Sequence, residues 1–295
     1  DLGYLPIRIR ALEEGEVVNA RVPIYTIENT LPEFFWVTNF LETALSCLSW
    51  LPMTSATTAR KYRDLLDYWC DRTGGDMGTV QFQGHDFSFR GMSSLESAAV
   101  SGAAHLLSFV GTDTIPAIDF LEDHYYACCE EEIVGCSVPA TEHSVMCMGG
   151  SDEDEEAETF RRMMEDVVPS GIVSIVSDTW DFWYVVTNII PSFKDKIMER
   201  DGKVVIRPDS GDPADIICGT RQDTMGPECT PEEKGLIQCL YETFGGTETD
   251  KGYKVLDAHI GAIYGDSITL DRANDICYRL ANKGFASTNI VLGIG

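Results

Sequence analysis

Six short apolar runs, each ending in a small or charged residue, limit most strongly how this chain can fold. They read TVQFQGHDF, LLSFVGTDT, GIVSIVSDTWD, KVVIRPDSGDP, AHIGAIYGDS and NIVLGIG. Parallel strands that are buried on both faces read as continuous apolar runs, and their carboxyl ends gather polar residues at one edge. Helical patterns follow most of the runs. The sequence therefore predicts an α/β fold around a parallel barrel. An open doubly wound sheet is the second choice, because no G-x-G-x-x-G motif follows an early strand.

Capping signals place the expected helices between these runs. The signals are an opening at TLPE (30–33), a helix over 57–71 stopped by Gly74 and Gly75, boxes at SSLE (93–96) and TPEE (230–233), and an amphipathic pattern over 270–284. Serine or threonine followed three residues later by glutamate satisfies two backbone groups at a helix start. A run read as VQFQ, residues 80–83, alternates as a strand does and is expected to be the first barrel strand.

The chain divides into two expected parts. Residues 1–29 are rich in strand formers and are assigned to part of a β-rich α+β domain, and residues 30–295 to the barrel. The chain starts within a strand pattern and stops directly after NIVLGIG, so a fragment trimmed at both ends is expected, with the barrel incomplete at its C-terminal end.

Charge narrows the classes of partner. The net charge is −26, which disfavours nucleic acid as a partner. Part of this charge lies in SDEDEEAE (151–158), read as the acidic first turn of a helix capped by Ser151. No apolar run approaches 18 residues, so no membrane span is expected. An anionic substrate must then be bound by a few local arginines.

Ten cysteines are scattered without a C-x-x-C motif, and there are five histidines. This usage fits reduced thiols in the cytosol, so a cytoplasmic location is expected, and no zinc ligand spacing is present.

The ends of the six runs carry a consistent chemistry. Their polar residues, with those nearby, are Asp86, Asp113, Asp178, Asp209, Asp266, Arg90, Arg207, His85 and His143. Arginines pair with phosphate oxygens, and aspartates near phosphates hold Mg²⁺ or accept hydrogen bonds from ribose hydroxyls. No nucleophile elbow or cysteine–histidine pair is evident. This set suits a sugar-phosphate ligand with a metal.

The segments HDFSFRGMSS, FVGTDT, GCSVPATEHS, VSIVSDTWD, VVIRPDSGDP and IYGDSITL, in this order, closely resemble the nicotinamide phosphoribosyltransferase family. The similarity covers essentially the whole chain. It implies a type II phosphoribosyltransferase fold: an irregular β/α barrel beside a β-rich α+β domain, working as a homodimer. It implies transfer of phosphoribosyl from phosphoribosyl diphosphate to nicotinamide, giving nicotinamide mononucleotide and diphosphate in NAD salvage.

The resemblance assigns roles to matching positions. Phe87 matches the aromatic that stacks on the nicotinamide ring, and Arg90 a residue near the base and the phosphates. His143 matches a histidine whose phosphorylation couples ATP hydrolysis to synthesis, so His143, rather than His85, is the expected histidine of the chemistry. The other matches are Ser174 (base contact), Asp178 (catalytic site), Arg207 and Asp209 (ribose and substrate), Gly265 and Asp266 (ribose), and Gly293 and Gly295 (opening a phosphate loop).

Asp113 bears on the choice of substrate. It matches a carboxylate that accepts a hydrogen bond from the carboxamide N–H of nicotinamide. A nicotinate carboxylate about 4 Å away would be repelled by roughly 4 kcal/mol at an effective dielectric constant of about 20. Asp113 therefore favours the amide, although a nicotinate phosphoribosyltransferase stays an alternative.

The expected mechanism passes through an oxocarbenium-like state as diphosphate leaves. Mg²⁺ and arginines would stabilise the diphosphate, and Asp178 and Asp209, also the candidates for contact with Mg-diphosphate, would offset the positive ring. The resemblance also implies that ATP is a coupling substrate and that residues from a second subunit complete the site. A non-catalytic ligand-binding or interaction relative is another alternative. An aldolase-type barrel is disfavoured, since no Schiff-base lysine or metal histidines stand at strand ends.

Overall fold

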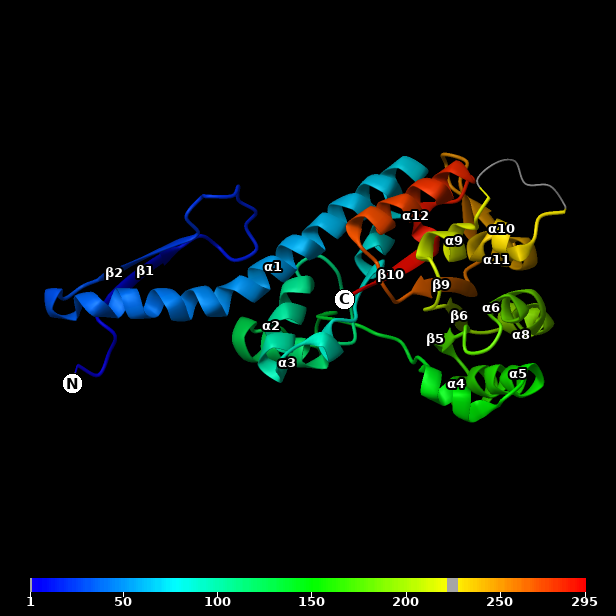
Figure 1. Cartoon of the computed structure of the whole chain (residues 1–295), viewed down its shortest axis with the longest axis horizontal. Coiled ribbons are helices and arrows are strands. Elements are labelled where there is room, and N and C mark those ends of the chain that lie inside the picture. The colour runs from blue at the N-terminus through cyan, green and yellow to red at the C-terminus, as the bar shows by residue number, and fades with distance from the viewer. Residues whose placement is uncertain (1, 222–227) are drawn as a thin grey trace.

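A curled parallel sheet forms the centre of the molecule, shown in Figure 1. The computed structural model describes residues 2–221 and 228–295. The strands are β1 Ile7–Ala11, β2 Tyr25–Asn29, β3 Gly84–Asp86, β4 Gly111–Thr112, β5 Gly171–Val176, β6 Gly202–Arg207, β7 Gly246–Glu248, β8 Lys254–Leu256, β9 Ile260–Tyr264 and β10 Ile290–Ile294. The α-helices are α1 Phe35–Thr73, α2 Leu95–His105, α3 Ile115–Tyr125, α4 His143–Gly149, α5 Glu153–Arg162, α6 Phe182–Tyr184, α7 Ile190–Ser192, α8 Lys194–Met198, α9 Pro213–Cys218, α10 Pro231–Lys234, α11 Leu236–Phe244 and α12 Leu270–Asn282. Shorter turns are the 3₁₀ segments Pro32–Phe34, Met77–Phe82, Phe89–Gly91 and Ser287–Asn289 and the π segments Met163–Val167 and Val185–Ile189.

All six predicted runs contribute a strand to this sheet. Its order is β4-β3-β10-β9-β6-β5, and every neighbouring pair is parallel. The inward and outward faces are both covered, so residues such as Val173, Ile175 and Ile206 are fully buried. The predicted α/β class is therefore confirmed.

An extended segment between α3 and α4 joins the two edges of the sheet. Cys136 forms a parallel bridge with Gly111 of β4, and Ala140 forms one with Ser174 of β5. Its backbone bonds include Cys136 N to Val110 O at 2.7 Å and Ser174 N to Pro139 O at 2.9 Å. The six strands and this segment, residues 136–141, thus make a closed, irregular barrel rather than an open sheet.

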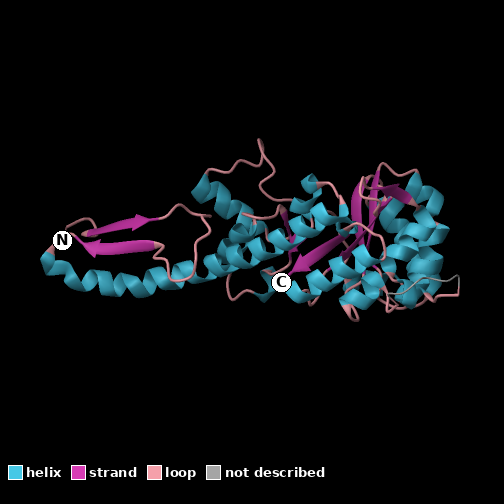
Figure 2. Cartoon of the chain, turned by 90° about the horizontal axis from the view of Figure 1, so that it is seen from above, coloured by secondary structure: helices cyan, strands magenta, loops and turns pink. Residues whose placement is uncertain are grey.

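The N-terminal part forms an arm that projects from the barrel. Strands β1 and β2 pair antiparallel, and Figures 1 and 2 show this hairpin beside the N-terminal half of α1, away from the barrel. The expected strand content of residues 1–29 is present, while the domain boundary after residue 29 stays a prediction.

The prediction of two helices between residues 30 and 71 is wrong. One helix of 39 residues, α1, runs through Pro52 and ends at Gly74, which adopts φ 71° as a left-handed cap. Thr30 caps nothing there, because a 3₁₀ turn from Pro32 precedes the helix. The second half of α1 packs on the barrel through buried Tyr62 and Leu66. These tertiary contacts stabilise one continuous helix where the local sequence pattern predicts two.

Four other local predictions need correction. Residues 80–83 lie mostly in a 3₁₀ turn that Asp76 caps at Gly78 N, so the strand begins only at Gly84. The cap of α5 is Asp152, not Ser151. The box that starts α2 joins Ser94 to Ser97 rather than Ser93 to Glu96. The helix opened by the Thr230–Glu233 box is present but is broken at Gly235 into α10 and α11.

Further features bear on the class of protein. All ten cysteines lie in the described ranges and are free thiols. In the described residues, no helix is long and apolar enough to cross a membrane.

The helix predicted over 270–284 is α12, and Ala273, Ile276, Cys277 and Leu280 form its buried face.

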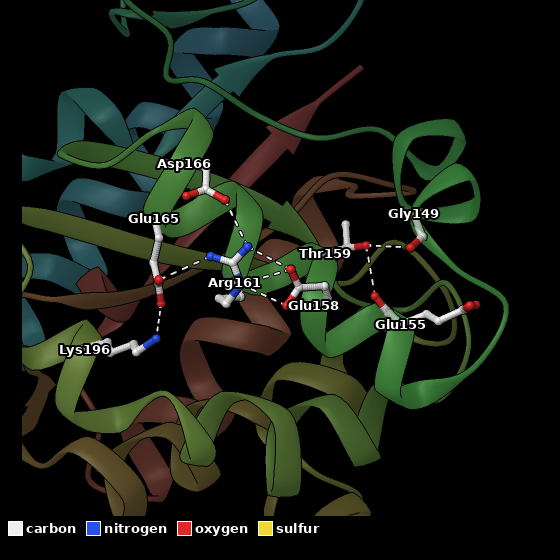
Figure 3. Close-up of polar contacts among 8 residues, drawn as sticks. All are labelled: Gly149, Glu155, Glu158, Thr159, Arg161, Glu165, Asp166 and Lys196. Carbon is white, nitrogen blue, oxygen red and sulfur yellow. Dashed lines mark hydrogen bonds and ion pairs between the residues drawn. The ribbon is translucent and has the colours of Figure 1, made fainter.

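Polar and charged side chains join α5 to its neighbours, as Figure 3 shows. Arg161 binds Glu158 at 2.7 Å, Asp166 at 3.0 Å and Glu165 at 3.3 Å, and Glu165 also pairs with Lys196. Thr159 Oγ1 donates to the carbonyl oxygens of Gly149 and Glu155. The bond from Thr159 to Gly149 attaches α5 to the end of α4, the helix that begins at His143. The Arg161 contacts join α5 to the π segment after it, and the Glu165–Lys196 pair links that segment to α8.

Glu156 on α5 is an unusual buried acid. It is 1% exposed, and neither carboxylate oxygen has a hydrogen-bond partner within the described residues. Burial, followed by the negative charges of Asp181, Asp178 and Glu153, raises the pKa of Glu156 from 4.5 to about 7. The side chain therefore prefers to be neutral in the folded protein.

This pKa predicts a dependence of stability on pH. Between pH 4.5 and about 7 the unfolded chain ionises Glu156 while the folded protein keeps the proton, so stability falls as pH rises, by ~3 kcal/mol in all. Glu156→Gln removes this loss. The difference in unfolding free energy, variant minus wild type, should rise by about that amount from pH 4.5 to 8 in denaturant titrations. Glu131→Gln, at an exposed position, serves as the control. A difference that stays flat with pH would contradict the prediction.

Candidate active site

A cleft of about 840 Å³ lies at the carboxyl ends of the sheet strands. It is bounded by residues that follow β3, β4, β6, β9 and β10, together with Glu142 from the loop before α4. Eight of the predicted site residues line it: Phe87, Arg90, Asp113, Arg207, Asp209, Gly265, Asp266 and Gly295. Ligand sites of parallel α/β folds occupy this position.

Phe87 is held at the centre of the cleft by backbone. Its N–H donates to Ile294 O at 2.8 Å, which attaches the residue after β3 to the end of β10. A Cβ placed on Gly293 would lie 2.4 Å from Phe87 Cδ2, and one on Gly265 would lie 3.2 Å from Phe87 Cε2. The ring therefore packs on two glycines, and larger residues at either position would displace it.

The role predicted for Gly293 needs correction on this point. Gly293 lies inside strand β10, where it pairs with His85, and does not open a loop. Its small size makes room for the Phe87 ring. Gly295, directly after β10, lines the cleft.

Arg207 and Asp209 form an ion pair beside Phe87. Arg207 Nη2 lies 3.1 Å from Asp209 Oδ2, and the two side chains are 11% and 16% exposed. Gly265 N donates to Asp209 Oδ1 at 3.3 Å, and the Arg207 guanidinium lies 5.3 Å from the centre of the Phe87 ring. The aromatic ring of Phe87, the positive charge of Arg207 and the negative charge of Asp209 thus lie side by side on one wall of the cleft.

His143 and Asp178 form a second pair that is joined to the first. His143 Nε2 lies 3.1 Å from Asp178 Oδ1, while Asp178 Oδ2 accepts a hydrogen bond from Asp209 N at 2.9 Å. The Asp178 side chain is 4% exposed and that of His143 is 44% exposed. The buried carboxylate therefore holds an accessible imidazole and fixes the backbone at Asp209.

Glu142 lines the cleft, although no motif in the sequence singled it out as a site residue. Its carboxylate lies 3.5 Å from Arg90 Nη2 and 3.9 Å from Arg207 Nη1. It connects the two cleft arginines and stands directly before His143, at the start of α4. The only available signal was its position next to a candidate histidine, in a loop without periodicity.

Asp113 receives two hydrogen bonds on the same oxygen. His85 Nε2 lies 2.8 Å and Ser137 Oγ 2.5 Å from Asp113 Oδ1. Burial alone would raise the pKa of Asp113, but the hydrogen bonds from His85 and Ser137 and the charges of His85 and Arg207 outweigh it and hold this pKa below 3.8. Asp113 is therefore a carboxylate at neutral pH. Sequence reasoning missed Ser137.

The remaining candidates have simpler surroundings. Asp86 accepts from Ser88 N and from Thr114 Oγ1, so it fixes two turns and is 3% exposed. Asp266 is exposed and binds Ser267 Oγ at 2.7 Å. Ser174 is 4% exposed, its hydroxyl has no partner within the described residues, and it does not line the cleft.

A resident metal does not fit these carboxylates. In the described residues, no group of three or more His, Cys, Asp or Glu side chains could hold an ion. Both oxygens of Asp178 and both of Asp209 already bind protein groups.

Comparison with known proteins gives consistent matches. The chain is 54% identical over 301 residues to a nicotinamide phosphoribosyltransferase of Acinetobacter baylyi. This match covers 100% of the present chain and 58% of the relative. The chain is 38% identical over 297 residues to the nicotinamide phosphoribosyltransferase of Mycoplasma pneumoniae and 38% over 296 residues to that of Xanthomonas campestris pv. campestris, covering 99% of this chain and 61% and 58% of those proteins. The chain thus spans about three fifths of the length of the curated relatives that it matches.

A family model gives the assignment. The model described as the nicotinate phosphoribosyltransferase (NAPRTase) family matches residues 82–295, which include the barrel and the cleft. The order of motifs, the parallel barrel and this match agree, and the chain belongs to the nicotinate phosphoribosyltransferase (NAPRTase) family.

Proposed function

We propose that the protein transfers the phosphoribosyl group of phosphoribosyl diphosphate to nicotinamide, forming nicotinamide mononucleotide and diphosphate in NAD salvage. The observation that carries this proposal is the cleft in which Phe87, Asp113 and the Arg207–Asp209 pair meet. Relatives with the name nicotinamide phosphoribosyltransferase, up to 54% identical, support it. The reaction is that of a pentosyltransferase.

The cleft supplies the features that a pyridine amide requires. Phe87 offers a flat apolar ring, Asp113 a carboxylate that accepts the amide N–H, and Arg207 and Arg90 positive charge for the phosphates. The Arg207 guanidinium lies 5.3 Å from the centre of the Phe87 ring, so a pyridine bound at this ring would have a positive charge for the phosphates beside it. Ser174 is a proposed base contact, Asp266 and Gly265 are proposed ribose contacts, and Gly295 is a proposed phosphate contact.

The chain's own residues perform the transfer by position and charge. The pyridine nitrogen needs no deprotonation, so a strong general base is not required. As the bond to diphosphate lengthens, positive charge develops on the ribose ring, and the Asp209 carboxylate stabilises it. Asp178 orients Asp209 through the 2.9 Å backbone hydrogen bond. Arg207 and Arg90 bind the leaving diphosphate. Mg²⁺ bound to the diphosphate would neutralise its charge as it departs.

His143 is the proposed site of ATP-coupled phosphorylation. Asp178 binds its Nε2, so with the proton on Nε2 the other ring nitrogen, Nδ1, carries the lone pair. A carboxylate that holds an imidazole in one tautomer is the arrangement that activates histidine elsewhere. The side chain is 44% exposed, which leaves Nδ1 accessible to a phosphate donor.

The assembly proposed is a homodimer whose site is completed in trans. The arm presents large exposed apolar side chains, among them Trp36, Phe40 and Trp50 on α1, which a further chain segment or a second subunit would cover. Neither nucleic acid nor membrane is a proposed partner, and the proposed location is cytoplasmic.

The decisive experiment is a phosphoribosyl transfer assay on the full-length gene product, with nicotinamide and nicotinate, each with and without ATP. Formation of nicotinamide mononucleotide in preference to nicotinate mononucleotide is expected. Preference for nicotinate would favour the acid-specific alternative. No transfer to either pyridine, with both substrates bound, would favour a non-catalytic binding protein.

The first prediction about the proposed function concerns Asp113. Asp113→Ser should lower the preference for nicotinamide over nicotinate, measured as the ratio of kcat/KM values, by at least about tenfold. The charge that repels nicotinate is lost, although solvent screens part of this repulsion at a side chain 46% exposed. Asp113→Asn, which keeps the shape, should show the same direction. An unchanged ratio in both variants would remove Asp113 from substrate selection.

The second prediction concerns Asp209. Asp209→Ala should reduce kcat with saturating substrates by about 100-fold, since a preorganised charge at the reacting centre is lost. Asp215→Ala breaks another aspartate–arginine pair, Asp215 with Arg279 at 2.8 Å, outside the cleft, and should leave kcat unchanged. Full turnover by Asp209→Ala would sink the proposed mechanism.

The third prediction concerns His143. After incubation with ATP labelled on the γ-phosphate, wild-type protein should carry acid-labile label, and His143→Ala should carry none and lose the stimulation of transfer by ATP. Transfer without ATP should persist, because the cleft residues remain. His124→Ala, at an exposed histidine of α3, is the matched control. Label retained by His143→Ala would place the phosphorylation elsewhere.

A further inference from the structure

His85 is a buried histidine directed at a cleft residue. It lies in β3 and is 9% exposed, yet its Nε2 lies 2.8 Å from Asp113 Oδ1. The mechanism above does not use it. Its ring is also 4.8 Å from that of Phe87, at an interplanar angle of 52°. His85 therefore contacts both the aromatic ring and the carboxylate proposed to bind the pyridine.

The hydrogen bonds to Asp113 are asymmetric. His85 and Ser137 both bind Oδ1. In residues 2–221 and 228–295, no hydrogen bond to Oδ2 is present. The side chain is 46% exposed and lines the cleft. A carboxylate held through one oxygen keeps the other available, so the two donors leave Oδ2 as the acceptor for a ligand.

The position of His85 is itself fixed from behind. A Cβ placed on Gly111 of β4 would lie 2.8 Å from His85 Nδ1, so the imidazole occupies space that only glycine leaves open. Backbone pairing of His85 with Gly111 and with Gly293 holds its Cα on both sides. With the ring so confined, Nε2 has little freedom to leave Asp113. An exposed carboxylate ordinarily samples several rotamers, and this contact opposes that freedom.

We propose that His85 is a specificity-determining positioning residue, which holds the Asp113 carboxylate toward the pyridine carboxamide and so favours amide over acid substrates. This inference rests on the function proposed above. With His85 in place, Asp113 accepts the amide N–H and repels a carboxylate. Without it, Asp113 can turn away, so nicotinamide loses an acceptor and nicotinate loses a repelling charge. Both effects lower the preference for nicotinamide over nicotinate.

A merely structural role for His85 predicts a different result. Removing a core histidine that only supports β3 would lower kcat/KM for both substrates equally and would lower thermal stability. The ratio of the two kcat/KM values separates these cases, because a general loss of folded enzyme cancels from the ratio.

The test uses substitutions at His85 in the full-length gene product. His85→Ala should reduce the nicotinamide-to-nicotinate ratio of kcat/KM by at least about tenfold, the change expected from losing a hydrogen bond to a charged group. The loss should be in KM for nicotinamide more than in kcat. His85→Gln keeps an N–H donor near the position of Nε2 and should restore most of the ratio. His259→Ala breaks a matched histidine–aspartate pair, His259 with Asp257 at 2.6 Å, at the other end of β9, and should not alter the ratio.

A double-substitution cycle tests whether His85 acts through Asp113. In an Asp113→Asn background, His85→Ala should have little further effect on the ratio, because the charge that it orients is absent. An equal loss for both pyridines in His85→Ala, or a full effect in the Asp113→Asn background, would overturn the inference. Wild-type protein that transfers to neither pyridine would overturn the proposed function instead, so the two failures are distinct.

Discussion

The closing of the barrel by residues 136–141 is the constraint on which the site depends. This segment pairs with β4 on one side and β5 on the other through backbone hydrogen bonds. It carries Ser137 to Asp113 at the first edge and leads Glu142 and His143 to Arg207 and Asp178 at the second. Without it β4 and β5 would be free edges, and two halves of the cleft would not meet. The contacts between α4 and α5 hold its far end.

A chain of charged side chains then joins the parts of the cleft. Asp178 binds the backbone of Asp209, Asp209 pairs with Arg207, and Arg207 approaches Glu142, which approaches Arg90. A protein of net charge −26 has no general attraction for an anionic substrate. Arg207, whose side chain is 11% exposed and paired with Asp209, and the well-exposed Arg90 supply positive charge locally at the cleft.

The strand ends could be predicted from the sequence because parallel strands produce continuous apolar runs that stop at polar residues, and all six runs form strands. Periodicity failed at residues 80–83, where the Asp76 cap starts a 3₁₀ turn, and along α1, where packing of Tyr62 and Leu66 outweighs composition. Ser137 had no signal in the sequence, and Glu142 had only its position beside His143. Ser137 lies in residues 136–141, and Glu142 directly follows them. The structure of this segment comes from backbone bonds to distant strands, and such bonds leave no pattern in the residues themselves.

Four aspartates at equivalent strand ends show how the surroundings divide roles among identical side chains. Asp86 is buried and bonded to two turns, so it is structural. Asp178 is nearly as buried but turns one oxygen to His143. Asp209 is paired with Arg207 and borders the cleft. Asp113 alone of these four is about half exposed and held through one oxygen, which leaves it a charge to present to a ligand. A motif of strand followed by aspartate predicts a site, but the donors around each carboxylate decide what it does there.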